Sequence, residues 1–207
     1  ASLSTQVPVG LHVGHGVKQV STEKVHVTGN LQNTGNDLDI SIDGAGFFQI
    51  LQPNGIIAYS RDGHFNIDGQ GRLVTNDGMP VDPEINIPVD TRKVEISNDG
   101  TVSVFLRDET QPEAIGSLQL ARFQNPAGLT PIGKNLYVST PASGNAVLDS
   151  PATNGMGGLN QGFLEGSNVS LVEEMVNMIT AQRAYEVNSK AIQSSDEMLK
   201  TANGLIR

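Results

Sequence analysis

The fold is decided by the C-terminal stretch of residues 170–206, which reads SLVEEMVNMITAQRAYEVNSKAIQSSDEMLKTANGLI. Large apolar side chains recur at every seventh position of this stretch, and a flanking row of small or apolar side chains follows the same repeat. The first row comprises Leu171, Met178, Tyr185, Ile192, Leu199 and Ile206, and the flanking row comprises Ala184, Ala191, Met198 and Leu205. A strict seven-residue repeat is typical of a coiled coil. The stretch therefore predicts one long helix that packs against another helix.

The predicted helix has a clear start. Ser170 and Glu173 have the spacing of a capping box, in which each side chain accepts a hydrogen bond from the backbone N–H of the other residue. Glu173 and Glu174 place negative charge in the first turn, where the helix dipole favours it. The pair Asn203-Gly204 predicts the end. A helix of about 34 residues is roughly 50 Å long.

A helix of this length needs a partner that covers its apolar rows. Its charged side chains exclude a membrane span, and nothing else in the sequence has the period of a second long helix. The partner is therefore expected in other chains, or in a segment before Ala1. The alternative is a helix that folds back on its own β domain, but the helix is long for a domain of this size. The expected self-assembly interface comprises Leu171, Met175, Met178, Tyr185, Ile192 and Leu199, and the small residues Ala181, Ala184, Ala191 and Ala202 favour close helix–helix approach.

The composition limits the classes of function. The net charge is −9 and the pI is about 4.8, which argues against nucleic acid and anionic membranes as partners. The chain has no cysteine, so it has neither a disulfide framework nor a thiolate metal site. The 23 glycines and 10 prolines indicate many turns between short strands.

From Leu31 onward the sequence predicts short strands. Residues 38–43 alternate apolar and polar side chains, which predicts a half-buried strand with an acidic outer face. Two hairpins are predicted across the turns Gln52–Gly55 and Ser97–Gly100. Further strands are predicted at 64–67, 72–75, 115–123 and 136–138. The regular spacing of turns favours a short-stranded sandwich or a small barrel, so the predicted fold class is mainly β with one long C-terminal helix of coiled-coil type.

The predicted organisation has three parts. Residues 1–30 form an extended arm or linker, residues 31–162 a β-rich domain, and residues 163–207 the C-terminal helix with its lead-in. Three prolines suggest a boundary within the β-rich part near residues 80–90. Residues 139–162 are rich in Ser, Pro, Gly and Asn, which predicts a loop or a loosely packed return.

The sequence offers no convincing catalytic, metal or cofactor site. Residues 39–50 and 66–77 resemble calcium loops, but position twelve is Ile50 in the first and Asp77, where a Glu is usual, in the second. His12 and His15 lack a third ligand nearby, and His26 and His64 have no diagnostic spacing, so solvated histidines are expected. No nucleophile elbow occurs, and no phosphate-binding glycine loop precedes a helix in a βαβ context. We therefore predict neither an enzyme nor a bound cofactor.

Several long motifs resemble the bacterial flagellar rod and hook proteins. They include GNLQNTGN at 29–36, LDISIDG at 38–44, YSRDGHF at 59–65 and GRLVT at 71–75. The run EGSNVSLVEEMVNMI at 165–179 continues into QRAYE at 182–186 and NSKA at 188–191, and is similar to the distal rod type in particular, as are NPAGL at 125–129 and NLY at 135–137. The resemblance covers nearly the whole chain.

This resemblance implies a structural subunit of the flagellar basal body. Family members have an N-terminal helix that pairs with the C-terminal one, and Ala1 is expected to fall just after it. The resemblance further implies export through the flagellar type III apparatus, and assembly into a hollow rod that crosses the periplasm and transmits torque to the hook. Expected partners are further copies of the chain, the proximal rod proteins, the hook protein and the surrounding P and L ring proteins. The competing interpretation is a secreted β-sandwich that binds a ligand or acts as an adhesin, with a helical oligomerisation tail; an exposed aromatic platform would favour it. A phage tail or baseplate protein is a variant of the structural interpretation.

Overall fold

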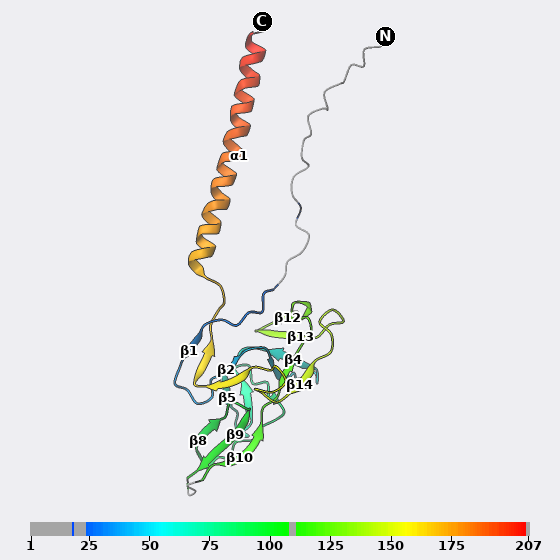
Figure 1. The fold of residues 1–207 in the computed structure, drawn as a ribbon, viewed down its shortest axis with the longest axis vertical. Coiled ribbons are helices and arrows are strands. Elements are labelled where there is room, and N and C mark those ends of the chain that lie inside the picture. The colour runs from blue at the N-terminus through cyan, green and yellow to red at the C-terminus, as the bar shows by residue number, and fades with distance from the viewer. Residues whose placement is uncertain (1–17, 19–23, 108–110, 206–207) are drawn as a thin grey trace.

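The computed structural model describes residues 18, 24–107 and 111–205, which form a β domain and one long helix that projects away from it (Figure 1). The strands are β1 (Leu31–Asn33), β2 (Ile40–Asp43), β3 (Phe47–Leu51), β4 (Ile57–Ser60), β5 (Phe65–Ile67), β6 (Leu73–Thr75), β7 (Val81–Asp82), β8 (Thr91–Ile96), β9 (Thr101–Leu106), β10 (Glu113–Ser117), β11 (Leu120–Arg122), β12 (Thr130–Gly133), β13 (Leu136–Val138), β14 (Val147–Asp149), β15 (Gly158–Gln161) and β16 (Phe163–Glu165). The helices are the short 3₁₀ helix η1 (Pro126–Gly128) and α1 (Leu171–Leu205). The predicted fold class, mainly β with one C-terminal helix, is confirmed.

The strands pair antiparallel in several small sheets. The largest has the order β12-β13-β4-β3-β11-β14, with β7 also paired to β3. A three-stranded sheet has the order β10-β9-β8, and three ribbons pair β1 with β16, β2 with β15, and β5 with β6. Both predicted hairpins are present, as β3–β4 and β8–β9. Their turns close with backbone hydrogen bonds from Gly55 to Gln52 and from Gly100 to Ser97, as Asn- and Asp-containing turns favour.

One apolar core spans most of the β domain. Ile40, Phe48 and Phe65 lie in it together with Val94 and Val104 from the β8–β9 hairpin. The core thus takes side chains from both sides of residues 80–90, and the proline-rich stretch does not separate two cores. A smaller cluster contains Phe47, Tyr59, Ala121, Phe123 and Leu129.

The strand β2 corrects one prediction. Residues 38–43 were expected to have an acidic outer face, but the side chains of Asp39 and Ser41 are buried as completely as those of Ile40 and Ile42. The reason is that β15 pairs with β2, and the Ser41 hydroxyl donates to the carbonyl of Asn160. The expected acidic face is therefore buried at Asp39 and Ser41 and remains exposed at Asp43, the last residue of β2.

The C-terminal return of the β domain is also more ordered than predicted. Residues 139–162, expected as a loop, contain β14 and β15, and residues 163–165, grouped with the helix, form β16 and pair with β1. Residues 115–123 are split between β10 and β11 rather than forming one strand. Apart from β10, which pairs with the preceding strand β9, each of these strands obtains its hydrogen bonds from a partner distant in sequence, which a local pattern does not reveal.

The helix α1 begins at the predicted position and runs for 35 residues. The backbone N–H of Glu173 lies 3.5 Å from the Ser170 hydroxyl, which is half of the predicted capping box. Among the described residues the Glu173 carboxylate makes no return bond, because the helix start is exposed and water can solvate the carboxylate. The predicted end at Asn203-Gly204 is wrong, since the helix passes through Gly204 to Leu205. Apart from Lys18, the predicted arm is described only from residue 24, and residues 24–30 lie outside helices and strands.

Candidate assembly interface

The helix α1 is exposed along almost its whole length. The six predicted interface side chains range from 52% exposed at Met175 to 77% exposed at Tyr185. Leu171, Met178, Ile192 and Leu199 fall between these values. The alternative of a helix folded back on its own β domain is therefore wrong for the described chain. The structure brings none of these side chains into contact with the β domain, so their apolar surface is left for a partner.

The seven-residue row does not run straight along the helix. A straight α-helix drifts by about 20° per heptad against a strict seven-residue repeat. From Leu171 to Leu199, four heptads apart, the row therefore rotates by about 80° around the axis. A partner helix that stays on the row must wind around α1 with a left-handed supercoil, which is the geometry of coiled coils.

The first third of α1 carries more apolar surface than the predicted row. Val172, Val176 and Ile179 are at least half exposed, in addition to Leu171 and Met178. At about 100° per residue, these five side chains spread over nearly half of the helix circumference. A single coiled-coil seam is narrower, so this end of the helix has surface for more than one neighbour. The sequence contained the signal in the adjacent apolar pairs 171–172, 175–176 and 178–179, but the row was predicted from its seven-residue spacing alone.

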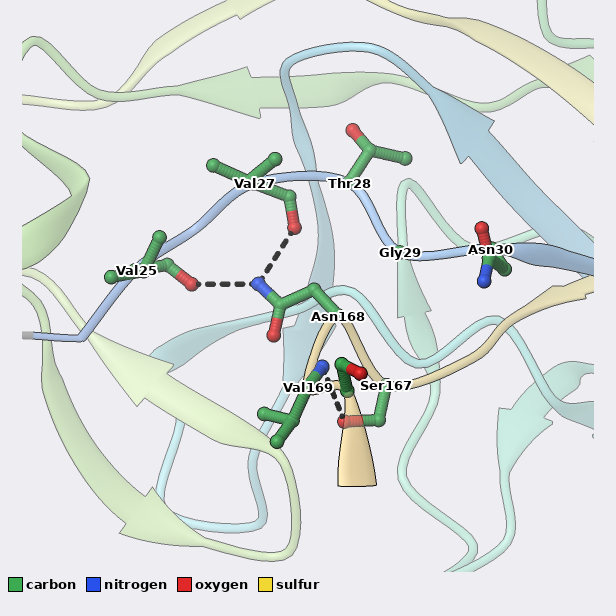
Figure 2. Close-up of a pocket in the computed structure, with 9 residues that line it drawn as sticks. Val25, Val27, Thr28, Gly29, Asn30, Ser167, Asn168 and Val169 are labelled. Atoms are coloured by element: carbon green, nitrogen blue, oxygen red, sulfur yellow. Dashed lines mark hydrogen bonds between the residues drawn. The ribbon is translucent and has the colours of Figure 1, made fainter. Parts of the chain in front are cut away.

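The helix joins the β domain through residues 165–170, and residues 24–30 run beside this segment; we call the two segments together the stem root. Figure 2 shows how the Asn168 side chain links them. Its amide nitrogen donates to the carbonyls of Val25 and Val27, at 3.1 and 3.0 Å. The backbone N–H of Gly166 donates to the carbonyl of Asn30 at 2.8 Å. Segments about 140 residues apart in sequence thus lie side by side, and an open groove of about 390 Å³ lies between them.

Arg61 ties the stem root to the β domain. Its guanidinium pairs with the carboxylate of Glu165, with Nε and Nη2 each 2.8 Å from Oε2. The other Glu165 oxygen accepts from the backbone N–H of Gly29 at 2.9 Å. The remaining Arg61 hydrogens reach the carbonyls of Ile42, Gly44 and Gly46 at 3.0–3.3 Å. Because the two charged side chains are 104 residues apart, no local sequence pattern indicates this pair.

His26 holds the N-terminal half of the stem root against the β domain. Its ring packs edge to face on Phe47 and Tyr137, with ring centroids 5.6 and 5.4 Å away. Its Nε2 is buried and has no hydrogen-bond partner within the described ranges. Burial, followed by the positive charges of Lys24 and Arg61, lowers the pKa of His26 from its ordinary value of 6.5. The prediction of a solvated side chain is wrong here, because the ring is used for packing.

His64 is likewise engaged, since its Nδ1 lies 2.6 Å from Oδ1 of the buried Asp39. The Asp39 carboxylate also accepts from the side chains of Thr34 and Asn36, so it fixes the loop before β2. In the second calcium-like segment, the Asp68 carboxylate accepts from Arg72. Hydrogen bonds from the Arg72 and Gln70 backbones and the Arg72 side chain lower the pKa of Asp68. His12 and His15 lie outside the described residues.

The described residues contain neither a cluster suited to a metal ion nor a helix suited to a membrane. Across residues 24–107 and 111–205, no three His, Asp or Glu side chains lie close enough together to hold a metal ion. In the same part of the chain, no helix combines the length and the hydropathy that crossing a membrane requires.

Comparison with known proteins gives a consistent result. Residues 41–104 match the D1 domain of the flagellar hook protein FlgE/F/G, and residues 160–205 match the C-terminal region of the flagellar basal body rod FlgEFG proteins. The flagellar basal-body rod protein FlgG of Buchnera aphidicola subsp. Acyrthosiphon pisum is 50% identical over 205 residues, which cover 99% of this chain and 79% of that protein. FlgG of Borreliella burgdorferi is 47% identical over 209 residues, covering 100% of this chain and 79% of that protein. FlgG of Bacillus subtilis is 40% identical over 200 residues, which cover 94% of this chain and 75% of that protein.

Proposed function

The chain belongs to the FlgG family of flagellar basal-body rod proteins, and we propose that it is a distal rod subunit that self-assembles into a hollow helical tube. Its family makes it a structural rod subunit of the basal body. The tube, its position in the rod and its role as a drive shaft are the proposed part. In this role the subunit would carry motor torque towards the hook.

The observation that carries the proposal is the exposed helix α1. Its 35 residues present an apolar row, and within the described residues nothing in the chain covers that row. Exposed apolar surface of this extent marks an interaction site. We propose that Leu171, Met175, Met178, Tyr185, Ile192 and Leu199 line the contacts between helices in the inner tube, with Ser170 and Glu173 capping each helix.

The β domain would form the outer wall of the tube. Each copy would contact the next through two different surface patches, and such a head-to-tail interface produces an open helical assembly when the rotation does not close. Torque would then pass through many moderate contacts rather than through one site. The expected neighbours are further copies of the chain, the proximal rod proteins, the hook protein and the P and L ring proteins. Export by the flagellar type III apparatus and a rod that crosses the periplasm belong to the same proposal.

The adhesin or ligand-binding alternative has no support. It requires an exposed aromatic platform, but Phe47, Phe48 and Phe65 are buried in the β domain, as are Tyr59 and Phe123. The aromatic side chain with large exposure in the described chain is Tyr185, on the helix. The family is likewise a structural one rather than an enzyme family.

Electron microscopy of basal bodies from cells that lack this protein tests the proposal. A rod that stops short and carries no hook is the expected result. A complete rod that lacks only the hook would move the assignment to the hook itself. Intact flagella in the deletion strain would refute a role in the rod. Complementation with the wild-type gene is the control, because it excludes effects on neighbouring genes.

A further inference from the structure

We propose that Arg61 is the positioning residue of a joint that fixes the direction in which the stem root leaves the β domain. The joint comprises Arg61, Glu165 and Gly29, together with the carbonyls of residues 42–46 that Arg61 contacts. Its mechanical role, which is to keep the outer domain from swivelling on the inner tube under torque, rests on the proposed function. The joint itself is a property of the single chain.

The joint matters because few contacts connect the two parts, the other main one being the packing of His26 on Phe47 and Tyr137. Within the described chain, α1 makes no packed interface with the β domain, and the chain connection runs through residues 166–170, with residues 24–30 beside them (Figure 1). These segments enter the β domain as the β1–β16 ribbon, which has three residue pairs from Leu31↔Glu165 to Asn33↔Phe163. None of the six ribbon side chains is fully buried. An isolated two-stranded ribbon is at best marginally stable in water, so the ribbon alone would twist and open.

Arg61 has the chemistry that such a joint needs. The guanidinium is planar, and its five N–H donors point in fixed directions. Two of its nitrogens, Nε and Nη2, bind the Glu165 carboxylate, and the third, Nη1, donates to the carbonyls of Gly44 and Gly46 in the β2–β3 connection. Glu165 passes the constraint to the other segment by accepting from the N–H of Gly29. The Arg61 and Glu165 side chains are only 16% and 12% exposed, so the pair is weakly screened by water and salt.

The backbone approach at Gly29 locks the two segments together. A Cβ atom built on Gly29 would lie 2.0 Å from the carbonyl oxygen of Gly166, a distance that no real side chain allows. The segments therefore touch backbone to backbone, and the Asn168 amide holds them a few residues further along (Figure 2). As a result, fixing Glu165 and Gly29 fixes both segments as one unit.

Two measurements on the isolated chain test the joint. Hydrogen exchange compares wild type with Arg61→Ala, Arg61→Lys and the control Arg72→Ala, which removes the Arg72–Asp68 pair on another loop. We expect Arg61→Ala to speed exchange at residues 28–33 and 163–166 by tenfold or more, with β3 and β4 unchanged. Arg61→Lys should recover only part of the protection, because an ammonium group cannot reproduce the guanidinium fork. The control should leave these amides at wild-type rates.

The second measurement reports the direction of the stem root relative to the β domain, rather than the hydrogen-exchange protection of its amides. The chain has no cysteine, so spin labels can be placed at Val169→Cys, in the stem root, and at Ser117→Cys, on β10, both exposed positions. We expect a narrow distance distribution in the wild type and in Arg72→Ala, and a clearly broader one in Arg61→Ala. Unchanged amide exchange and an unchanged distance distribution in Arg61→Ala would overturn the proposal. Faster exchange throughout the β core would also overturn it, because Arg61 would then stabilise the whole domain rather than the joint. Because neither experiment needs assembly, failure of the joint and failure of the rod proposal are distinguishable.

Discussion

Replacing Met178 by Asp should prevent assembly while leaving the chain folded. Met178 is 60% exposed in the single chain. Burying a Met side chain contributes about 1.5–3 kcal/mol, so covering the exposed part of Met178 would contribute roughly 1–2 kcal/mol per subunit. A carboxylate at the same position adds a desolvation cost of several kcal/mol. The total of at least about 3–5 kcal/mol weakens each contact by a factor of about 10² or more.

The same substitution should hardly affect the isolated chain. The side chain points to water there, and the helix propensity of Asp is only about 0.5 kcal/mol below that of Met. Ser194→Asp is the matched control, because at about 100° per residue it adds the same charge on nearly the opposite face of the helix. The assay is motility and electron microscopy of basal bodies in cells that express each variant, together with circular dichroism of the purified chains. The reasoning is refuted if Met178→Asp cells build rods and swim like the wild type, or if Ser194→Asp abolishes assembly equally.

Three further predictions concern the single chain. Gly63→Ala should lower the free energy of unfolding by about 2–4 kcal/mol, because its Cβ would lie 1.6 Å from the carbonyl oxygen of the buried Ile40. Gly69→Ala, with open space around it, should be nearly neutral, and equal denaturation midpoints for the two variants would contradict the prediction. Burial and then the neighbouring cations lower the pKa of His26 from 6.5, so the unfolded state binds more protons and the free energy of unfolding falls as the pH drops below 6.5. An NMR titration of His26 should show a midpoint below 6.5, and a His26→Phe chain should lack this loss of stability. In dilute monomer, amides of residues 175–195 should exchange quickly, because α1 lacks tertiary contacts; strong protection there would argue that the helix is stable alone.

The sequence was informative wherever the physics is local. The start of α1 follows from the capping residue Ser170 and an acidic first turn. The exposed apolar row follows from the seven-residue spacing, because residues seven apart lie near the same side of a helix. The β3–β4 and β8–β9 hairpins were predictable for the same reason, because their turn residues specify the turn and the turn fixes the pairing of adjacent strands. The end of the helix was predicted wrongly at Asn203-Gly204, because Gly204 tolerates helical geometry and α1 passes through it to Leu205.

Only the tertiary structure decided which distant segments meet. The return through residues 139–162 looks like a loop in sequence, yet β15 pairs with β2 along the edge where the Ser41 side chain is buried. The pair Arg61–Glu165 and the backbone contact between Gly29 and Gly166 join positions more than a hundred residues apart. A sequence pattern reports the periodicity and turn chemistry within one segment, whereas these contacts depend on how the whole chain folds. That is why the exposed helix could be predicted from sequence, while the joint that holds it could not.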